Sequence, residues 1–286
     1  MKCYLINLDR SPERYNWFLE STAKLNLDII RVVAIDGNRL PASEIASLQS
    51  LRSGYFDVAK GEIGCFLSHR NVWQFISDGD EEWSFVAEDD IHFSGGCGKF
   101  FDNDNWLPTD ADLVKAETTL KVVDISYIKK VRVFGRGVGR LNSHHGGSGG
   151  YFLSKKTAKR LLKMTEFMCD PVDQVLFNPE LGVSNGLNTY QIDPALCIQD
   201  SMIKGSSHFR GLESLLDEER EGHLHSKVRM RGFAKIWREI LPLFRKARNF
   251  IRVYIINLSV SKTVYCPLQE QQDIESNNDR EQHYGR

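Results

Sequence analysis

The sequence predicts an α/β protein with a mostly parallel sheet, because a strand-helix-strand pattern opens the chain and a later apolar run ends in three acids. The apolar run Cys3–Leu8 is followed by Ser11-Pro12-Glu13, whose N-cap residue, proline and acid are typical of a helix start. A second apolar run, Ile29–Ile35, ends at the turn Asp36-Gly37-Asn38. A strand, a helix and a strand in this order indicate a right-handed parallel crossover.

The most informative stretch is Trp83–Phe93, in which the apolar run Phe85–Ala87 leads directly into Glu88, Asp89 and Asp90. The run predicts a buried parallel strand, and acids at the carboxyl end of such a strand lie where open α/β sheets bind ligands. Three adjacent carboxylates repel one another, so we expect a cation there. A divalent metal with oxygen ligands, carrying a phosphate-bearing substrate, fits this pattern. Taken alone, the three acids also fit a solvated acidic turn.

Further elements are expected along the chain. The pattern predicts a helix at Gly61–Trp73 and strands at Leu113–Lys115 and Val131–Phe134. A glycine-rich loop, His144–Gly150, then leads into a third strand, Tyr151–Leu153. A capped basic helix, Ser154–Lys163, and a final helix, Pro171–Leu176, follow. The glycine-rich loop is not a P-loop, because it lacks the GKS/T ending and a following helix. Without other information it fits a turn or linker as well as a ligand cradle.

Composition limits the function classes. A chain of 286 residues with 41% hydrophobic and 26% charged residues fits a globular enzyme of one large domain, with or without an appendage. The net charge of −1 argues against nucleic-acid binding. Six scattered cysteines without a CxxC pair, no signal-peptide pattern and no apolar stretch of 18 residues favour a reducing, cytoplasmic setting.

The charge is unevenly distributed, because residues 227–254 contain nine Lys or Arg and one Glu. Their local charge is +8, which leaves −9 for the remainder, since −9 + 8 = −1. Within Phe233–Ile255 a kink is expected at Pro242. Nine apolar residues of this range share one helical face: Phe233, Ile236, Trp237, Ile240, Leu241, Phe244, Ala247, Ile251 and Ile255. Such a helix can lie on an anionic membrane surface, although a packing helix with a solvated basic face fits the same pattern. We expect a domain at 1–212, a basic amphipathic helical extension at 213–265 and a polar, disordered tail at 266–286.

Four segments are more specific as a set than any one of them alone. They are Tyr4–Arg14 (YLINLDRSPER), Gly61–His69 (GEIGCFLSH), the acids Glu88–Asp90, and Gly149–Ser154 together with Pro171-Val172-Asp173. In order and spacing they resemble glycosyltransferase family 25, which includes bacterial lipooligosaccharide galactosyltransferases and the glycosyltransferase domains that modify collagen. The resemblance covers roughly residues 1–205, and its first two motifs are the specific ones.

The resemblance implies a GT-A-like fold, a nucleotide-sugar donor and a divalent metal, usually manganese (Mn²⁺). The chemistry needs such parts, since the departing nucleotide diphosphate gathers negative charge that a metal can neutralise. By the resemblance, Asp90 is expected to ligate the metal, while Asp89 and Glu88 approach the nucleotide. His144 or His145 could complete the metal shell or could simply be solvated loop residues.

The remaining assignments also follow from the resemblance. Asn7, Asp9 and Arg14 are expected to contact the nucleotide, although a capped helix with surface charges would also explain them. Asp36 is expected at the nucleobase or ribose, or else only shapes its turn. Further donor-site residues are expected at Ser68 and His69, where a satisfied core histidine is the alternative; the general base for an inverting transfer is expected at Asp173, where a helix-dipole acid is the alternative.

The sequence therefore predicts a metal-dependent glycosyltransferase that moves a sugar, by family expectation galactose, from a UDP-sugar to a lipid-linked lipooligosaccharide acceptor at the cytoplasmic face of the inner membrane. Two other classes are considered. A nucleotidyltransferase shares the sheet and the acidic metal site, but normally has a basic glycine-rich loop after the first strand, where this chain has Asn7–Pro12. A non-catalytic sugar- or lipid-binding module would keep the fold, and the intact acidic triplet argues against it.

Overall fold

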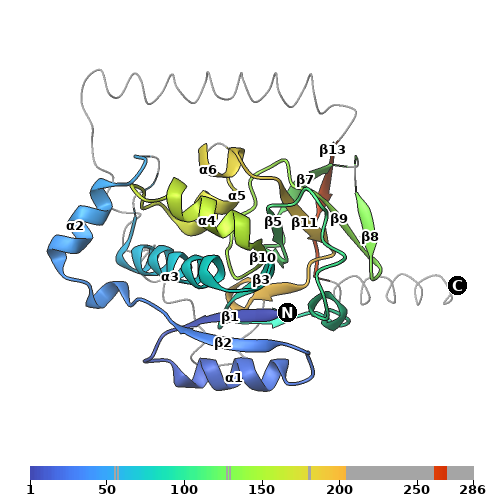
Figure 1. Ribbon diagram of the computed structural model, residues 1–286, viewed down its shortest axis with the longest axis horizontal. Coiled ribbons are helices and arrows are strands. Elements are labelled where there is room, and N and C mark those ends of the chain that lie inside the picture. The colour runs from blue at the N-terminus through green and yellow to red at the C-terminus, as the bar shows by residue number, and fades with distance from the viewer. Residues whose placement is uncertain are drawn as a thin grey trace, which may run out of the picture.

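The first strand, β1 (Lys2–Asn7), is an interior strand of the main sheet and is buried on both faces (Figure 1). Cys3 and Leu5 pack into one apolar cluster, whereas Tyr4 and Ile6 pack into another, as the two-residue period of a strand requires. β1 lies between β2 (Asp28–Val33) and β3 (Trp83–Glu88) and is parallel to both. The predicted parallel crossover is confirmed.

The computed structural model describes residues 1–203, apart from 55, 57, 127, 129, 180 and 181, together with residues 261–268. Its main sheet has the order β2-β1-β3-β10-β5-β11-β9-β8. Beyond β3 come β10 (Gly150–Ser154), β5 (Leu113–Lys115), β11 (Thr189–Asp193), β9 (Arg136–Arg140) and β8 (Val131–Val133).

Strand β10 is antiparallel to both β3 and β5, and β11 is parallel to β5. Strands β1, β2, β3, β5 and β11 therefore run in one direction, and their carboxyl ends meet at one edge of the sheet. The amino end of β10, which follows the glycine-rich loop, reaches the same edge. At the far side, β9 is antiparallel to β11, and β8 is antiparallel to β9.

Helices cover both faces of the sheet (Figure 1). On one face lie α3 (Lys60–Asp78), α4 (Lys155–Met164) and α5 (Val172–Phe177), accompanied by α2 (Ala42–Ser50) and α6 (Gly182–Asn185). The other face carries α1 (Pro12–Thr22) and an aromatic cluster around η2 (Gly98–Phe101). Short 3-10 turns occur at η1 (Gly37–Arg39) and η3 (Asp200–Met202). This mostly parallel sheet between helices is the GT-A-like architecture predicted above.

The two predicted helix caps have different outcomes. The Ser154 hydroxyl accepts a hydrogen bond from the Thr157 N–H at 3.1 Å, which confirms the cap of α4. Ser11 does occupy the position before Pro12, but its side chain makes no capping bond. The carbonyl of Ser11 instead accepts a hydrogen bond from the Asn7 amide at 3.0 Å, which ties the start of α1 to the end of β1.

Two smaller sheets flank the main one. Strands β4 (Ile91–Phe93), β12 (Cys197–Gln199) and β6 (Glu117–Thr118) form the first, and β7 (Val122–Ser126) pairs with β13 (Ser261–Tyr265) in the second. After β13, Cys266 and Leu268 are buried. Residues 261–265, which are predicted as part of a helical extension, form a strand instead. The predicted boundary between 265 and 266 falls within a packed segment, so 266–268 are not part of a polar, disordered tail. The predicted basic helix, Phe233–Ile255, and the tail from 269 lie outside the described residues.

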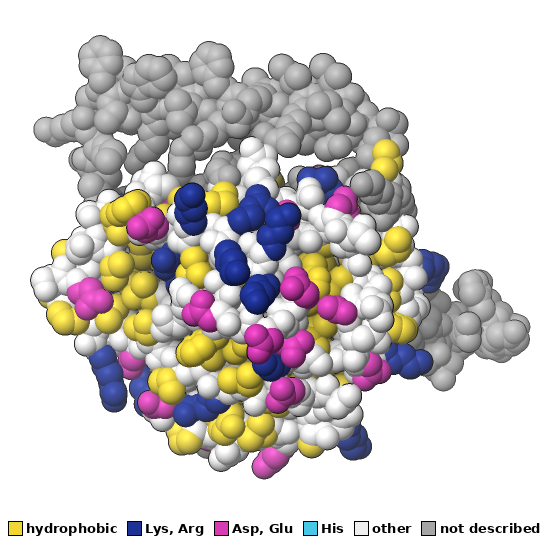
Figure 2. Space-filling view, viewed as in Figure 1, with side chains coloured by type: hydrophobic (Ala, Val, Ile, Leu, Met, Phe, Trp, Pro, Cys, Tyr) yellow, Lys and Arg dark blue, Asp and Glu magenta, His cyan; other side chains and the backbone are white. Residues whose placement is uncertain are grey.

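The exposed face of α4 is basic. Figure 2 shows Lys and Arg side chains gathered over this helix, whose sequence contributes Lys155, Lys156, Lys159, Arg160 and Lys163. Only Arg160 is in an ion pair described for this helix, with Asp112 at 3.0 Å. Among the described residues, no helix has the length and apolarity that crossing a bilayer requires.

Candidate functional site

A pocket opens at the sheet edge where the parallel strands end. Its lining comes from the ends of β1 and β3, the loop after β2, helices α1 and α3, and β12. Eight of the predicted site residues line it together: Asn7, Arg14, Asp36, Ser68, His69, Glu88, Asp89 and Asp90. The structure thus brings together motifs that lie more than 80 residues apart in the chain. Asp9 and Asp173 are not among the lining residues.

Two glycines allow α3 to approach the loop after β2. A Cβ atom on Gly64 would lie 2.4 Å from the Ile35 carbonyl oxygen, and one on Gly37 would lie 1.7 Å from the Lys60 carbonyl oxygen. Both neighbours are backbone atoms, so neither contact could be relieved by a side-chain rotation. The close approach directs the following turn of α3, with Cys65, Ser68 and His69, into the pocket.

The charge that opposes the acids is supplied first by the protein itself. Arg14 reaches Asp89 at 2.5 Å and Asp90 at 3.3 Å through Nη2. Asn7 donates from Nδ2 to the second oxygen of Asp89 at 2.6 Å. The repulsion of Glu88, Asp89 and Asp90 is therefore an incomplete argument for a metal, because a buried guanidinium from the first motif already supplies one positive charge.

The three acids have different proton affinities. Burial, opposed by Arg14 and reinforced by Glu88 and Asp89, raises the pKa of Asp90 to about 8. Burial also raises the pKa of Asp89. Burial alone would raise the pKa of Glu88, but hydrogen bonds from His69 and from a neighbouring serine, with the charge of Arg14, hold it below its ordinary value. An anionic Asp90 is therefore poorly stabilised by the protein alone, and a bound cation would favour it.

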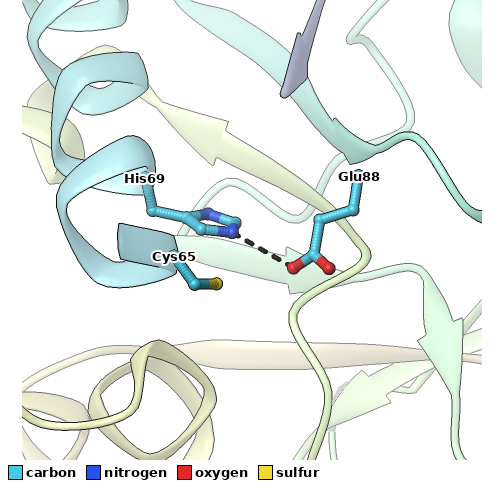
Figure 3. A group of neighbouring side chains, drawn as sticks. All are labelled: Cys65, His69 and Glu88. Atoms are coloured by element: carbon cyan, nitrogen blue, oxygen red, sulfur yellow. Dashed lines mark hydrogen bonds and ion pairs between the residues drawn. The ribbon is translucent and has the colours of Figure 1, made fainter. Parts of the chain in front are cut away.

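His69 is connected to the acids through a chain of hydrogen bonds. Trp73 Nε1 donates to the Tyr151 hydroxyl at 2.9 Å, and that hydroxyl lies 2.8 Å from His69 Nδ1. His69 Nε2 lies 3.2 Å from Glu88 Oε1, as Figure 3 shows. Since ionised Glu88 can only accept, Nε2 carries the hydrogen and Tyr151 donates to Nδ1. His69 is buried, but its polar edge faces the pocket.

Asn7 and Asp9 make contacts within the protein. The Asn7 amide donates to Ser11 and Asp89, while its oxygen accepts from Arg31 Nε at 2.9 Å. The hydrogen bond from Asn7 therefore fixes the orientation of the Asp89 carboxylate. Asp9 is exposed and accepts from Arg31 Nη2 at 2.8 Å. Asp9 therefore lies outside the pocket lining. It accepts a hydrogen bond from Arg31, which in turn donates to Asn7.

Ser68 and Asp36 shape the opposite wall. The Ser68 hydroxyl donates to the Gly64 carbonyl at 2.6 Å and accepts from the Ile35 N–H at 2.8 Å, so it joins α3 to the loop after β2. Asp36 accepts a hydrogen bond from the Asn38 N–H, which is the turn-shaping role given above as its alternative. It also accepts one from Arg10 Nε at 2.8 Å. Ser68 and Asp36, two of the predicted donor-site residues, therefore lie in the pocket wall. Arg10, which the sequence does not predict as a site residue, also lines the pocket.

Asp173 lies beside the glycine-rich loop rather than in the pocket wall. Its Oδ2 accepts from the Gly147 N–H at 3.2 Å, and its Oδ1 accepts from the Gln174 N–H at 2.8 Å. The next residue of the loop, Ser148, donates to Glu88 Oε1 at 2.7 Å. One short loop therefore separates Asp173 from the acids at the end of β3.

A buried ion pair lies under the same loop. Lys115 Nζ is 3.0 Å from Glu117 Oε2, and both side chains are fully buried. Lys115 also donates to the Gly147 carbonyl, and Gly149 N–H donates to Glu117 at 2.9 Å. Gly147 has φ +83°, and a Cβ there would lie 2.6 Å from Glu117 Oε1. The glycine-rich loop is therefore an anchored segment of the site and not a linker.

His145 does not complete a metal shell. Its Nδ1 lies 2.8 Å from Gln191 Oε1, and its Nε2 accepts from the Thr119 N–H at 3.3 Å. Both ring nitrogens are used, so the ring is neutral with the hydrogen on Nδ1. Burial, with the charge of Lys115, lowers the pKa of His145 to about 3.

Sequence reasoning missed several residues of the site. Gln199 donates to Glu88 at 3.0 Å and approaches Asp90 at 3.5 Å, but a lone glutamine on a short strand carries no signal. The pair Lys115 and Glu117 did carry one, because two charges alternate with apolar residues at the end of a predicted strand. Charges at buried strand positions are rare unless they are paired.

Comparison with known proteins agrees with this geometry. The profile described as Glycosyltransferase family 25 (LPS biosynthesis protein) matches residues 1–176, which is more than half of the chain. The chain belongs to glycosyltransferase family 25. Among its relatives, the lipooligosaccharide biosynthesis protein lex-1 of Haemophilus influenzae is 30% identical over 188 residues, covering 62% of this chain and 61% of that protein. The lipooligosaccharide biosynthesis protein lic2B of the same species is 27% identical over 215 residues, covering 72% and 77%.

This family-25 chain thus aligns with about three fifths of the length of lex-1. Solved structures are more distant. That of the inositol-1-phosphate CTP transferase from T. maritima has a TM-score of 0.41 and 13% identity, and covers 79% of this chain and 98% of the other. Similarity at this level carries no conclusion about activity, whereas the family profile identifies a glycosyltransferase family.

Proposed function

We propose that this member of family 25 is a metal-dependent transferase that moves a sugar, galactose by family expectation, from a UDP-sugar to a lipooligosaccharide-type acceptor with inversion. The observation that carries the proposal is the convergence of the acids after β3 with the first and second motifs in one pocket. Both relatives described above are named for lipooligosaccharide biosynthesis, which supports this acceptor class.

The pocket residues fit a divalent cation. Its lining contains Asp36, Glu88, Asp89 and Asp90, opposed by Arg10 and Arg14, so that the formal charge is 2 − 4 = −2. Asp89 is occupied by Arg14 and Asn7. Among the residues that the structure describes, Asp90 Oδ1 accepts only from Gln199, at 3.5 Å, which is a weak contact. Asp90 would therefore hold the metal, with Glu88 close to the nucleotide, and Mn²⁺ accepts such an oxygen ligand.

When bound, the cation neutralises the charge that gathers on the departing nucleotide diphosphate. The chain's own residues prepare the site for it. Arg14 keeps Asp89 and Asp90 together at the pocket floor, and Asn7 fixes the orientation of Asp89. Asp36, which lines the pocket beside Arg10, would meet the nucleobase or ribose.

The acceptor side is assigned to Asp173. The Gly147 N–H holds one oxygen of this carboxylate, and the carboxylate is only partly buried, so that an acceptor hydroxyl can approach it. In this role Asp173 removes the hydroxyl proton as the oxygen attacks the anomeric carbon.

The lipid-linked acceptor suggests where the enzyme acts. We propose that it lies on the cytoplasmic face of the inner membrane, held by the basic segment 227–254. The sequence of that segment supports this proposal through its local charge of +8.

The decisive experiment measures UDP release from UDP-galactose, UDP-glucose and UDP-N-acetylglucosamine by the full-length protein, with Mn²⁺ and with EDTA, and then transfer to truncated lipooligosaccharides. Metal-dependent release from one donor and transfer to one acceptor are expected. Pyrophosphate release from a nucleoside triphosphate and a sugar phosphate would instead favour the nucleotidyltransferase. Binding of a sugar nucleotide without turnover would favour a non-catalytic module.

A further inference from the structure

A second cluster of metal-ligating side chains lies in the same pocket. Cys65 and His69 project from successive turns of α3 toward Glu88 at the end of β3, as Figure 3 shows. One ligand atom from each, a sulfur, a nitrogen and an oxygen, can be chosen so that all three lie within 4.8 Å of one another. We propose that these three residues form a site for a soft divalent cation of the Zn²⁺ class, separate from the oxygen site at Asp90.

The separation between the histidine nitrogen and the carboxylate oxygen fits tetrahedral coordination. Bonds of about 2.0–2.1 Å from zinc to a histidine nitrogen and a carboxylate oxygen place those atoms roughly 3.3 Å apart at a tetrahedral angle. The observed distance between His69 Nε2 and Glu88 Oε1 is 3.2 Å. An ion could enter between them with the two side chains near their present positions. Cys65, one helical turn before His69, provides the third ligand.

The outer contacts of the cluster also suit a metal site. A ligating histidine usually makes a hydrogen bond through its other ring nitrogen, which fixes the orientation of the ring. Here the Tyr151 hydroxyl, itself fixed by Trp73, lies 2.8 Å from His69 Nδ1. On metal binding, His69 would carry its hydrogen on Nδ1 and donate it to Tyr151, whose oxygen can accept from Trp73 as well. Glu88 keeps its bonds from Ser148 and Gln199.

The ligand types determine which ion is selected. A thiolate and an imidazole favour Zn²⁺, Co²⁺ or Cu(I) over Mn²⁺ and Mg²⁺, which prefer oxygen. Cys65 is partly accessible and lines the pocket, whereas the other five cysteines are buried. Binding converts the Cys65 thiol to a thiolate and releases one proton to solvent.

Occupancy would affect the use of the donor. Glu88, which the proposed function places at the nucleotide, would be shared with the soft cation, so Zn²⁺ should compete with the sugar nucleotide. This consequence rests on the proposed function, whereas the existence of the site does not. Three protein ligands leave a fourth position open to the pocket, where water can bind.

The test is a Co²⁺ titration of the metal-free, full-length protein, followed by near-ultraviolet absorption, in which a thiolate bound to Co²⁺ gives a charge-transfer band. The wild type should give the band, and Zn²⁺ should abolish it. Cys65→Ser should remove the band, and Tyr151→Phe should keep it while weakening Co²⁺ binding about 10- to 100-fold. Asp90→Asn is the matched control in the same pocket, and should keep the band while losing Mn²⁺-dependent turnover.

A wild-type protein that binds Co²⁺ without the band, or a Cys65→Ser variant that retains it, overturns the site. Circular dichroism of each variant shows whether it is folded. If the band is present but no donor is turned over, the soft-cation site stands and the proposed function fails. In an active enzyme, Zn²⁺ should raise the KM for the donor, and the inhibition constant for Zn²⁺ should increase at least tenfold in Cys65→Ser.

Discussion

Arg14 shows how one residue changes the chemistry expected of its neighbours. It comes from the first motif, 75 positions before Asp89, yet its guanidinium touches both Asp89 and Asp90. Its single charge opposes three carboxylates, so the pocket keeps a negative excess. Burial, together with that excess, raises the pKa of Asp90 to about 8. A nucleotide diphosphate, which we propose as part of the donor, would add negative charge to this pocket, and a cation would offset it.

The first prediction concerns Asp90. Asp90→Asn should preserve the fold, because the neutral form of this carboxyl is already favoured by burial, and should lower turnover at least 100-fold, because the leaving group loses its metal. Turnover of a UDP-sugar as a function of Mn²⁺ concentration measures the effect. Full activity of the variant, or of the wild type in EDTA, would rule out the metal assignment.

The second prediction concerns Asp173. Asp173→Asn should abolish transfer while UDP binding, measured by calorimetry, stays within about twofold, because this side chain contacts the glycine loop and not the pocket wall. A proton acceptor typically contributes 10²- to 10⁴-fold, so a loss of that size is expected. A parallel fall of UDP affinity would move Asp173 to the donor side.

The third prediction uses His145, whose pKa is lowered to about 3 by burial and by nearby Lys115. In the unfolded chain a histidine has a pKa near 6.5. Between pH 6.5 and about pH 3 the imidazole is therefore protonated in the unfolded state and neutral in the folded state. Stability should therefore fall as the pH falls through this window. When the pH is lowered from 7 to 5, the free energy of unfolding of the wild type should fall by about 2 kcal/mol more than that of His145→Gln. Urea unfolding of both proteins at the two pH values measures the difference, and equal slopes would contradict it.

At the scale of elements, the contact of α3 with the loop after β2 is the joint that assembles the pocket. Gly64 has no space for a side chain, since two backbone atoms would lie within 3 Å of its Cβ. The fourth prediction is that Gly64→Ala lowers the free energy of unfolding by about 1–3 kcal/mol and weakens UDP binding, because α3 must move away from Asp36. Gly98→Ala is the matched control, since its Cβ would meet only a leucine methyl group at 3.7 Å. Equal effects would show that the joint tolerates displacement.

The elements that could be predicted are those with strong local patterns. The Cys3–Leu8 run, the proline-started helix and the strand before Glu88 are confirmed, because burial on both faces makes parallel strands uniformly apolar. Pairing was harder. Tyr151–Leu153 was expected as a strand, but nothing local shows that it lies antiparallel between β3 and β5. Strand β13 was not expected, because its partner β7 lies more than 130 residues earlier.

The site divides in the same way. The backbone position of each motif followed from its strand or helix, so eight predicted residues share one pocket. Contacts between side chains from distant segments could not be predicted, since no local sequence pattern indicates which nitrogen will bind which oxygen. Arg14 with Asp90 and Tyr151 with His69 are such contacts.

At the scale of the whole molecule, the chain returns to the domain after the basic segment. Strand β13 pairs with β7, and Cys266 is buried against Val123 and Ile125. Removing everything after residue 226 would thus remove a packed strand as well as the basic charges. Membrane binding is better tested by changing charges in the full-length chain.

The fifth prediction concerns these charges. The full-length protein should sediment with vesicles that contain anionic lipid at low salt, and less so as salt screens the attraction. Arg238, Arg245 and Arg248 changed together to Gln should weaken this binding about 100-fold, since each basic residue near the surface contributes roughly 1 kcal/mol. Changing Lys156, Lys159 and Lys163 on α4 to Gln removes the same charge from a different surface and is the matched control. If the α4 variant alone releases the protein, the basic face of α4 is the membrane surface, and if neither variant does, the enzyme reaches its acceptor without an electrostatic membrane contact.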